Sequence, residues 1–97
     1  MDYFNDPEFQ DLIRSYLDYL MDSLVTFKVN CVERNYSEIR KFAHNLKGSG
    51  GGYGFDDLTQ LGNDISSAAM RKDANKLDSL MKELEDLIMK KRTEYFN

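Results

Sequence analysis

The chain has 97 residues, which is enough for one domain with a single modest core. Its 41% hydrophobic and 31% charged residues are typical of a globular domain and exclude a disordered chain. The net charge of -4, without a cluster of Lys and Arg interleaved with aromatic residues, argues against a nucleic-acid binder.

Signals for a membrane or an oxidising compartment are missing from the sequence. No apolar run approaches the roughly 20 residues that cross a bilayer, and the N-terminal MDYFNDPEF lacks the charged-then-apolar layout of a signal peptide. Cys31 is the only cysteine, so we expect neither an intrachain disulfide nor a thiolate metal cluster. We therefore expect a cytoplasmic protein that forms a single domain over residues 1–97 and has no membrane attachment.

The first predicted helix spans residues 7–34. Asp6 is expected to cap it, Pro7 suits the first helical position, and Glu8 places an acid in the first turn. Apolar residues then recur at spacings of three and four, which indicates one buried stripe along an amphipathic helix. The stripe comprises Phe9, Leu12, Ile13, Tyr16, Leu20, Leu24, Phe27 and Cys31, and we expect Leu17, Met21 and Val25 to widen it.

The second predicted helix spans residues 36–52 and the third spans residues 56–71. Asn35 and Glu38 have the spacing of a capping box at the start of the second helix. Asp56 and Asp57 place carboxylates in the first turn of the third helix, where the helix dipole favours them. The inward residues are expected to be Ile39, Phe42, Ala43 and Leu46, with Tyr53 beyond them, and then Leu58, Leu61, Ile65 and Ala68.

The fourth predicted helix spans residues 74–95, with Asp73 as its cap and Lys90, Lys91 and Arg92 near the negative end of its dipole. Its apolar residues are Leu77, Leu80, Met81, Leu84, Leu87 and Ile88. Because short connections join the helices, the four apolar stripes are best buried together in an antiparallel up-down four-helix bundle. The predicted fold class is therefore all-α. We expect a monomer, in which Tyr3, Phe4, Tyr95 and Phe96 are exposed near the termini.

His44, the only histidine, is predicted to face solvent. A lone histidine in an amphipathic helix is more often a satisfied core residue. At about 100° per residue, however, His44 projects roughly 150° away from the core direction, which is defined by Ile39, Phe42, Ala43 and Leu46. The periodicity therefore favours an exposed imidazole midway along the second helix.

The neighbours of His44 on its own helix face are a cation and two glycines. Positions three, four and seven residues ahead share a face with it, and they hold Lys47, Gly48 and Gly51. Each glycine inside a helix costs about 1 kcal/mol relative to alanine, which favours a surface that something must approach closely. The alternative is that the helix stops at Gly48 and a flexible loop follows.

The chemistry of an exposed imidazole fits a site with a cation and glycines beside it. Such a ring is largely neutral at physiological pH, so a ring nitrogen is available as a nucleophile toward a phosphoryl group on a partner's carboxylate. Lys47 is placed to offset charge on the transferring group. Residues 36–54 carry Arg40, Lys41 and Lys47 against Glu38, a local +2 in an acidic protein, which suits an acidic partner.

The run HNLKGSGGGYGF, which begins at His44, closely resembles the histidine-containing phosphotransfer (HPt) domain. The motif of that family is His-x-Leu-Lys-Gly, then small residues, an apolar residue, Gly and a Leu-rich helix. Ala43 before the run and Leu58 and Leu61 after it also match. The motif occupies residues 43–61, and the order and length of the predicted helices match over the whole chain.

The resemblance implies a four-helix bundle with a phosphoaccepting imidazole exposed midway along the second helix. His44 would accept the phosphoryl group on Nε2, Lys47 would assist electrostatically, and Gly48 would keep the approach of the partner clear. Gly54 would allow the turn into the third helix. The candidate partner contacts are Arg40, Lys41, Gly51 and Ser66.

The resemblance also implies the partners. HPt domains exchange phosphoryl groups with the aspartate of receiver, or response-regulator, domains in phosphorelays that a sensor or hybrid histidine kinase feeds. This implies a phosphoryl carrier without its own nucleotide site, no cofactor of its own, and a Mg ion on the partner receiver. Many relatives carry Gln or Glu on the third helix near the histidine, where this chain has Ser66 and Ser67. The resemblance therefore does not assign the group that hydrogen-bonds the imidazole, and Ser66 and a water molecule are the two candidates.

Other interpretations fit less well. The glycine-rich run matches neither GxxxxGK[ST] nor GxGxxG and follows no predicted strand, which argues against a nucleotide site. One histidine cannot supply the Glu-x-x-His pairs of a carboxylate-bridged metal bundle, and no nucleophilic triad is indicated. The remaining alternative is a non-catalytic bundle that only binds a signalling partner, with His44 an incidental surface residue.

Overall fold

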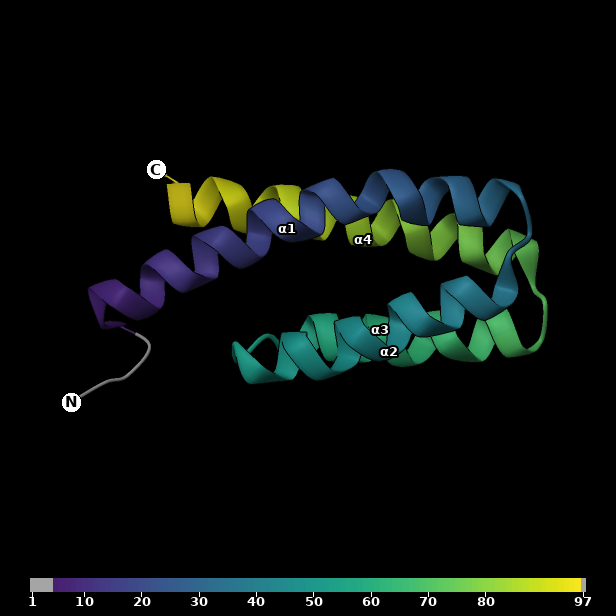
Figure 1. Cartoon of the computed structure of the whole chain (residues 1–97), viewed down its shortest axis with the longest axis horizontal. Coiled ribbons are helices and arrows are strands. Elements are labelled where there is room, and N and C mark those ends of the chain that lie inside the picture. The colour runs from purple at the N-terminus through teal and green to yellow at the C-terminus, as the bar shows by residue number, and fades with distance from the viewer. Residues whose placement is uncertain (1–4, 97) are drawn as a thin grey trace.

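A computed structural model of the protein describes residues 5–96, which form four helices joined by short turns. The helices are α1 (Pro7–Val32), α2 (Tyr36–Gly52), α3 (Asp56–Met70) and α4 (Ala74–Phe96). Figure 1 shows them as an antiparallel bundle in which each helix reverses the direction of the one before it. The predicted all-α four-helix bundle is confirmed, and each helix boundary lies within two residues of its predicted position.

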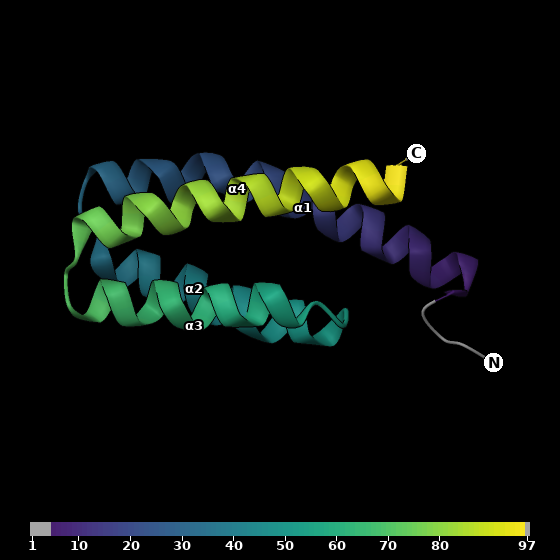
Figure 2. The ribbon, with the colours of Figure 1, turned by 180° about the vertical axis from the view of Figure 1, so that it is seen from behind.

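The bundle consists of two helix pairs. α2 and α3 form a hairpin, while α1 packs beside α4, and the α1–α2 and α3–α4 contacts close the bundle. Both views show the hairpin below the α1–α4 pair, with α1 extending past the hairpin at its N-terminal end (Figures 1 and 2). The N-terminal half of α1 nevertheless contacts the glycine-rich end of the hairpin, because Phe9 stacks on Tyr53 and the Tyr16 hydroxyl lies 2.7 Å from Ser49 Oγ.

The core is built from the predicted apolar stripes, with two errors in α1. Side chains with almost no exposed surface come from every helix: Ile13, Leu17, Phe27, Ile39, Leu58, Ile65, Leu77, Leu84 and Ile88. Leu12 and Val25 were expected in the core but are 52% and 67% exposed. At about 100° per residue they lie beside the stripe rather than in it, because α1 packs against only two neighbouring helices.

Two of the three predicted helix caps are confirmed. The Asp6 carboxylate accepts a hydrogen bond from the Glu8 backbone N–H at 2.8 Å, and Asp73 accepts one from the Lys76 N–H at 3.1 Å. Both bonds join groups within three residues of each other, so the local sequence determines them.

The predicted capping box at Asn35 is wrong. The side chain of Asn35 makes no cap hydrogen bond; its amide donates instead to Asn30 Oδ1 and Glu33 Oε2, both at 3.1 Å. Arg34 has a left-handed backbone, with φ of 60°, which ends α1 early and turns the Asn35 amide back toward that helix. Glu38 pairs with Lys41 at 3.2 Å instead of reaching back to Asn35.

The prediction that Lys90, Lys91 and Arg92 complement the negative end of the dipole of the fourth helix is also wrong. α4 continues to Phe96, and its last turn holds no basic residue. Lys91 is 9% exposed, and its Nζ lies 2.9 Å from Asp57 Oδ2 and 4.2 Å from the centre of the Phe55 ring. Lys91 therefore ties α4 to the start of α3, where a carboxylate also meets the positive end of the helix dipole.

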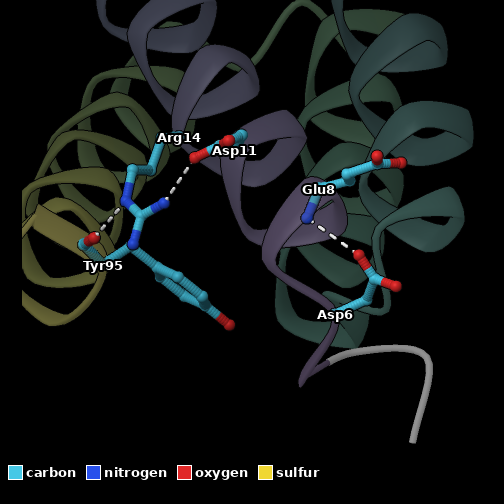
Figure 3. A network of polar contacts seen from close by, with 5 residues as sticks. All are labelled: Asp6, Glu8, Asp11, Arg14 and Tyr95. Atoms are coloured by element: carbon cyan, nitrogen blue, oxygen red, sulfur yellow. Dashed lines mark hydrogen bonds and ion pairs between the residues drawn. The ribbon is translucent and has the colours of Figure 1, made fainter. Parts of the chain in front are cut away.

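The N-terminal half of α1 is fixed to the C-terminal end of α4. Figure 3 shows Arg14 between the two helices: its Nε donates to the Tyr95 backbone oxygen at 2.7 Å, and its Nη1 contacts Asp11 Oδ1 at 2.9 Å. Tyr95 is half-buried against Phe55, and Phe96 is 46% exposed. Tyr3 and Phe4, expected to be exposed, lie outside the described residues.

Cys31 is buried near the C-terminal end of α1, where only 2% of its surface is exposed. Burial raises the pKa of its thiol to about 11, and the nearby Asp78 carboxylate adds to this shift. The thiol is therefore a small apolar core group in its protonated form.

Candidate functional site

His44 lies on the solvent side of α2. Two residues close to it in the helix point into the core: Ala43 is fully buried and Leu46 is 2% exposed, whereas His44 itself is exposed. The prediction that the imidazole faces outward is confirmed. A ring nitrogen in this position is open to groups that approach from solvent.

α2 remains helical well beyond His44. It continues to Gly52, so the alternative in which the helix stops at Gly48 is wrong. Lys47 and Gly48 therefore lie one turn from His44 on the same face, and both are exposed. A Cβ atom added to Gly48 would meet nothing within 4 Å, so the space beside the imidazole is empty. A Cβ on Gly51 would lie 3.3 Å from Thr59 Oγ1, so this glycine has a packing role as well.

Two shallow hollows flank His44. One lies toward α3 and is lined by Ser37, Arg40, Lys41, Asn45 and Ser66 together with His44. The other lies toward α1 and is lined by Tyr19, Leu20, Phe42, Leu46, Gly48 and Ser49 with His44 and Asn45. The structure thus brings Arg40, Lys41 and Ser66 together with His44. Gly51 lines neither hollow.

The cations near His44 differ in how they are paired. Lys41 Nζ lies 3.2 Å from Glu38 Oε1, so part of its charge is compensated. Arg40 and Lys47 form no ion pair with any described residue. They stand four residues before and three residues after His44, and positions with these spacings share a helix face. Two unpaired cations therefore flank the imidazole on its own face and are available to an anionic partner.

Gly62 on α3 is a site residue that the sequence interpretation missed. It is buried, and a Cβ atom there would lie 2.8 Å from the Ala43 carbonyl oxygen and 2.9 Å from the Lys47 nitrogen. The backbone of α3 therefore packs directly on the turn of α2 that carries His44. A glycine within the otherwise apolar stripe of the third helix was the available signal.

Replacing Gly62 by alanine is expected to destabilise the bundle by about 1–3 kcal/mol, because the added methyl group meets backbone atoms that cannot rotate away. Urea unfolding followed by circular dichroism measures the change. Gly48→Ala is the matched control, since that position has open space and alanine is the better helix former. Equal stability of Gly62→Ala and wild type would contradict the close approach of the two helices.

The glycine-rich end of α2 is held by side chains from both neighbouring helices. From α1, the Tyr16 hydroxyl lies 2.7 Å from Ser49 Oγ, and Ser49 Oγ donates to the Asn45 carbonyl at 2.7 Å. From α3, Thr59 Oγ1 donates to the Lys47 carbonyl at 3.1 Å. Burial raises the pKa of the Tyr16 phenol above its ordinary value. The helix then ends at a turn in which Gly54 has φ of 81°, as the motif implied.

No family model, no curated protein and no solved structure matches this chain. Within residues 5–96, no group of three or more His, Cys, Asp or Glu side chains is arranged to hold a metal ion. None of the four helices is long and apolar enough to cross a membrane. The geometry around His44 and the motif that contains it are the observations from which a function is inferred.

Proposed function

We propose that this protein is a histidine phosphotransfer protein of a two-component phosphorelay. His44 accepts a phosphoryl group and exchanges it with the aspartate of a receiver domain. The observation that supports this most directly is the exposed imidazole with Lys47 and Gly48 one turn away on the same helix face. The combination provides a nucleophile, a compensating charge and free space at one place.

The transfer step follows from these groups. Nε2 of His44 attacks the phosphorus atom of an aspartyl phosphate, so that an N–P bond forms while the P–O bond to the aspartate breaks. The aspartate carboxylate leaves with the electron pair of that bond. Lys47 offsets negative charge on the phosphoryl oxygens, and a Mg ion held by the partner receiver would supply further charge compensation.

The partner binds over the flanking hollows in this proposal. Arg40 and Lys41 attract the acidic surface of a receiver active site, and Ser66 contacts the receiver from the α3 side of the same hollow. Gly51, which lines neither hollow, is a partner contact on the face of α2 that carries His44. The protein carries the phosphoryl group between a sensor or hybrid kinase and a receiver in the cytoplasm, as a monomer. It needs no nucleotide or cofactor of its own, because the receiver supplies the rest of the site.

Incubation with a panel of ³²P-labelled receiver domains and Mg ion tests the function. We expect at least one receiver to lose its label to this protein within minutes. The label is expected to be lost in acid and to survive alkali, which is the signature of phosphohistidine, whereas aspartyl phosphate is lost in alkali. Failure of every receiver in the source organism to transfer label would leave a bundle that binds a signalling partner without transferring anything.

A further inference from the structure

The segment directly after His44 and Lys47 is helical although its composition opposes a helix. Four of the five residues from Gly48 to Gly52 are glycine, and α2 includes them all. Glycine is the poorest helix former after proline, because it loses the most backbone freedom when it is fixed. Contacts with other helices must therefore keep this turn ordered.

Two consecutive hydrogen bonds that begin at Tyr16 on α1 are the most specific of these contacts. Ser49 is the one residue of the segment with a side chain, and its hydroxyl donates its hydrogen to the Asn45 carbonyl. A hydroxyl has a single hydrogen to donate, so the 2.7 Å contact with Tyr16 is a bond in which the phenol donates to Ser49 Oγ. The two hydrogen bonds thus connect Tyr16, through Ser49, to the backbone carbonyl of Asn45, the residue next to His44.

Tyr16 is itself held in a fixed place. Its ring is 6% exposed and stacks on Tyr53, at 4.4 Å between ring centres, directly beyond the end of α2. Tyr53 also stacks on Phe9 at 5.9 Å. The part of α1 that carries Tyr16 is attached to α4 through Arg14 and the Tyr95 carbonyl, as Figure 3 shows. The phenol therefore meets Ser49 from a rigid support.

Loss of the hydrogen bond between Tyr16 and Ser49 would also disturb the helix face that carries His44 and Lys47. In a helix, the carbonyls of residues 44–47 accept hydrogen bonds from the N–H groups of residues 48–51. If the glycine-rich turn unwinds, these carbonyls lose their partners, and His44 and Lys47 become part of a fraying helix end. The separation between the imidazole and the Lys47 ammonium would then no longer be fixed.

We propose that Tyr16 is a positioning residue for phosphoryl transfer at His44, and that it acts through Ser49 by keeping the Gly48–Gly52 turn helical. The part of this inference that concerns phosphoryl transfer rests on the proposed function. The ordering of the turn is a separate claim, and it can be measured without any phosphoryl donor.

Amide hydrogen exchange of the full chain, read by NMR at Gly50, Gly51 and Gly52, tests the ordering. Tyr16→Phe and Ser49→Ala are each expected to speed exchange at these amides about five- to tenfold, which corresponds to the loss of one hydrogen bond. Ser49→Ala is the sharper variant, since alanine is a better helix former than serine and propensity alone predicts slower exchange. Tyr36→Phe is the matched control, because it removes a phenol hydroxyl from a half-buried tyrosine at the far end of α2.

The catalytic claim is tested with the same variants and a labelled receiver that serves wild type. We expect the rate constant at saturating receiver to fall at least threefold in Tyr16→Phe and Ser49→Ala, while the receiver concentration at half saturation stays within twofold. Tyr36→Phe is expected to match wild type in both quantities. The rate constants are expressed per folded protein, measured by circular dichroism of the same preparation, because loss of folded protein alone would also lower the apparent rate constant.

Each outcome decides one of the claims. Unchanged exchange in both variants would overturn the ordering of the turn by Tyr16. Faster exchange with an unchanged rate constant would overturn the positioning role. A wild-type protein that takes up no label from any receiver would overturn the proposed function and the positioning role with it, while the exchange rates would still decide the ordering.

Discussion

Phosphoryl uptake from a receiver is expected to fall at least about a hundredfold, to background, when glutamine replaces His44. The imidazole is the only one in the chain, and glutamine has a polar side chain without a nucleophilic ring nitrogen. Because His44 is exposed, the stability of the variant should stay within about 0.5 kcal/mol of wild type. The measurement is label transfer from the receiver that serves wild type, with circular dichroism to establish the fold.

The acid and alkali stability of any residual label serves as the control for this variant. Label that remains in His44→Gln and is lost in both acid and alkali would belong to a carboxylate, and label lost in alkali alone would belong to a serine or threonine hydroxyl. Label that survives both treatments would belong to a tyrosine hydroxyl. Uptake by His44→Gln at the wild-type rate would contradict the assignment of His44 as the acceptor. The protein would then be better described as a partner-binding bundle.

A leucine at Gly48 is expected to slow transfer at least tenfold without destabilising the fold. The position is exposed and a Cβ atom added there meets nothing within 4 Å, so the side chain is not forced into the core. Leucine is the better helix former, and stability should rise by roughly 0.5–1 kcal/mol. The same side chain would occupy the empty space one turn from the imidazole, where a receiver must approach. Transfer kinetics and urea unfolding of the same preparation measure the two opposite effects.

Gly52→Leu provides a matched control for this experiment. Gly52, the last residue of α2, is also exposed, and a Cβ atom added there would meet nothing within 4 Å, so neither leucine is forced against a neighbouring helix at its Cβ. It lies eight residues from His44, roughly 12 Å along the helix and about 80° around it. We expect Gly52→Leu to transfer at close to the wild-type rate. Equal rates in the two leucine variants would show that free space at Gly48 has no part in transfer.

Features that depend on neighbouring residues could be predicted from the sequence. The spacing of apolar residues by three and four positions predicts the four helices, and the caps at Asp6 and Asp73 act within one turn. Asn35 failed as a cap because Arg34 takes a left-handed conformation at the chain reversal, which redirects the amide to Asn30. The geometry of that reversal depends on how α1 and α2 pack, and periodicity carries no information about it.

The candidate site also combines features of a single helix, which could be predicted, with contacts between helices, which could not. The outward direction of His44 and the positions of Lys47 and Gly48 follow from one helix and its period. The contact of Gly62 with the α2 backbone and the bond between Tyr16 and Ser49 join residues from different helices. Such contacts require the relative offset of two helices, which the sequence pattern of either one leaves undetermined. The roles of Arg40, Lys41, Gly51 and Ser66 as partner contacts remain predictions.

The buried thiol of Cys31 makes the native protein convenient for fluorescence work. With a pKa of about 11 and 2% of its surface exposed, this thiol is protonated and shielded at neutral pH, and maleimide dyes react with exposed thiolates. A second cysteine placed at an exposed position such as Asn75 would therefore be labelled selectively while Cys31 stays in the core. Receiver docking could then be followed by energy transfer in a protein whose interior is unaltered.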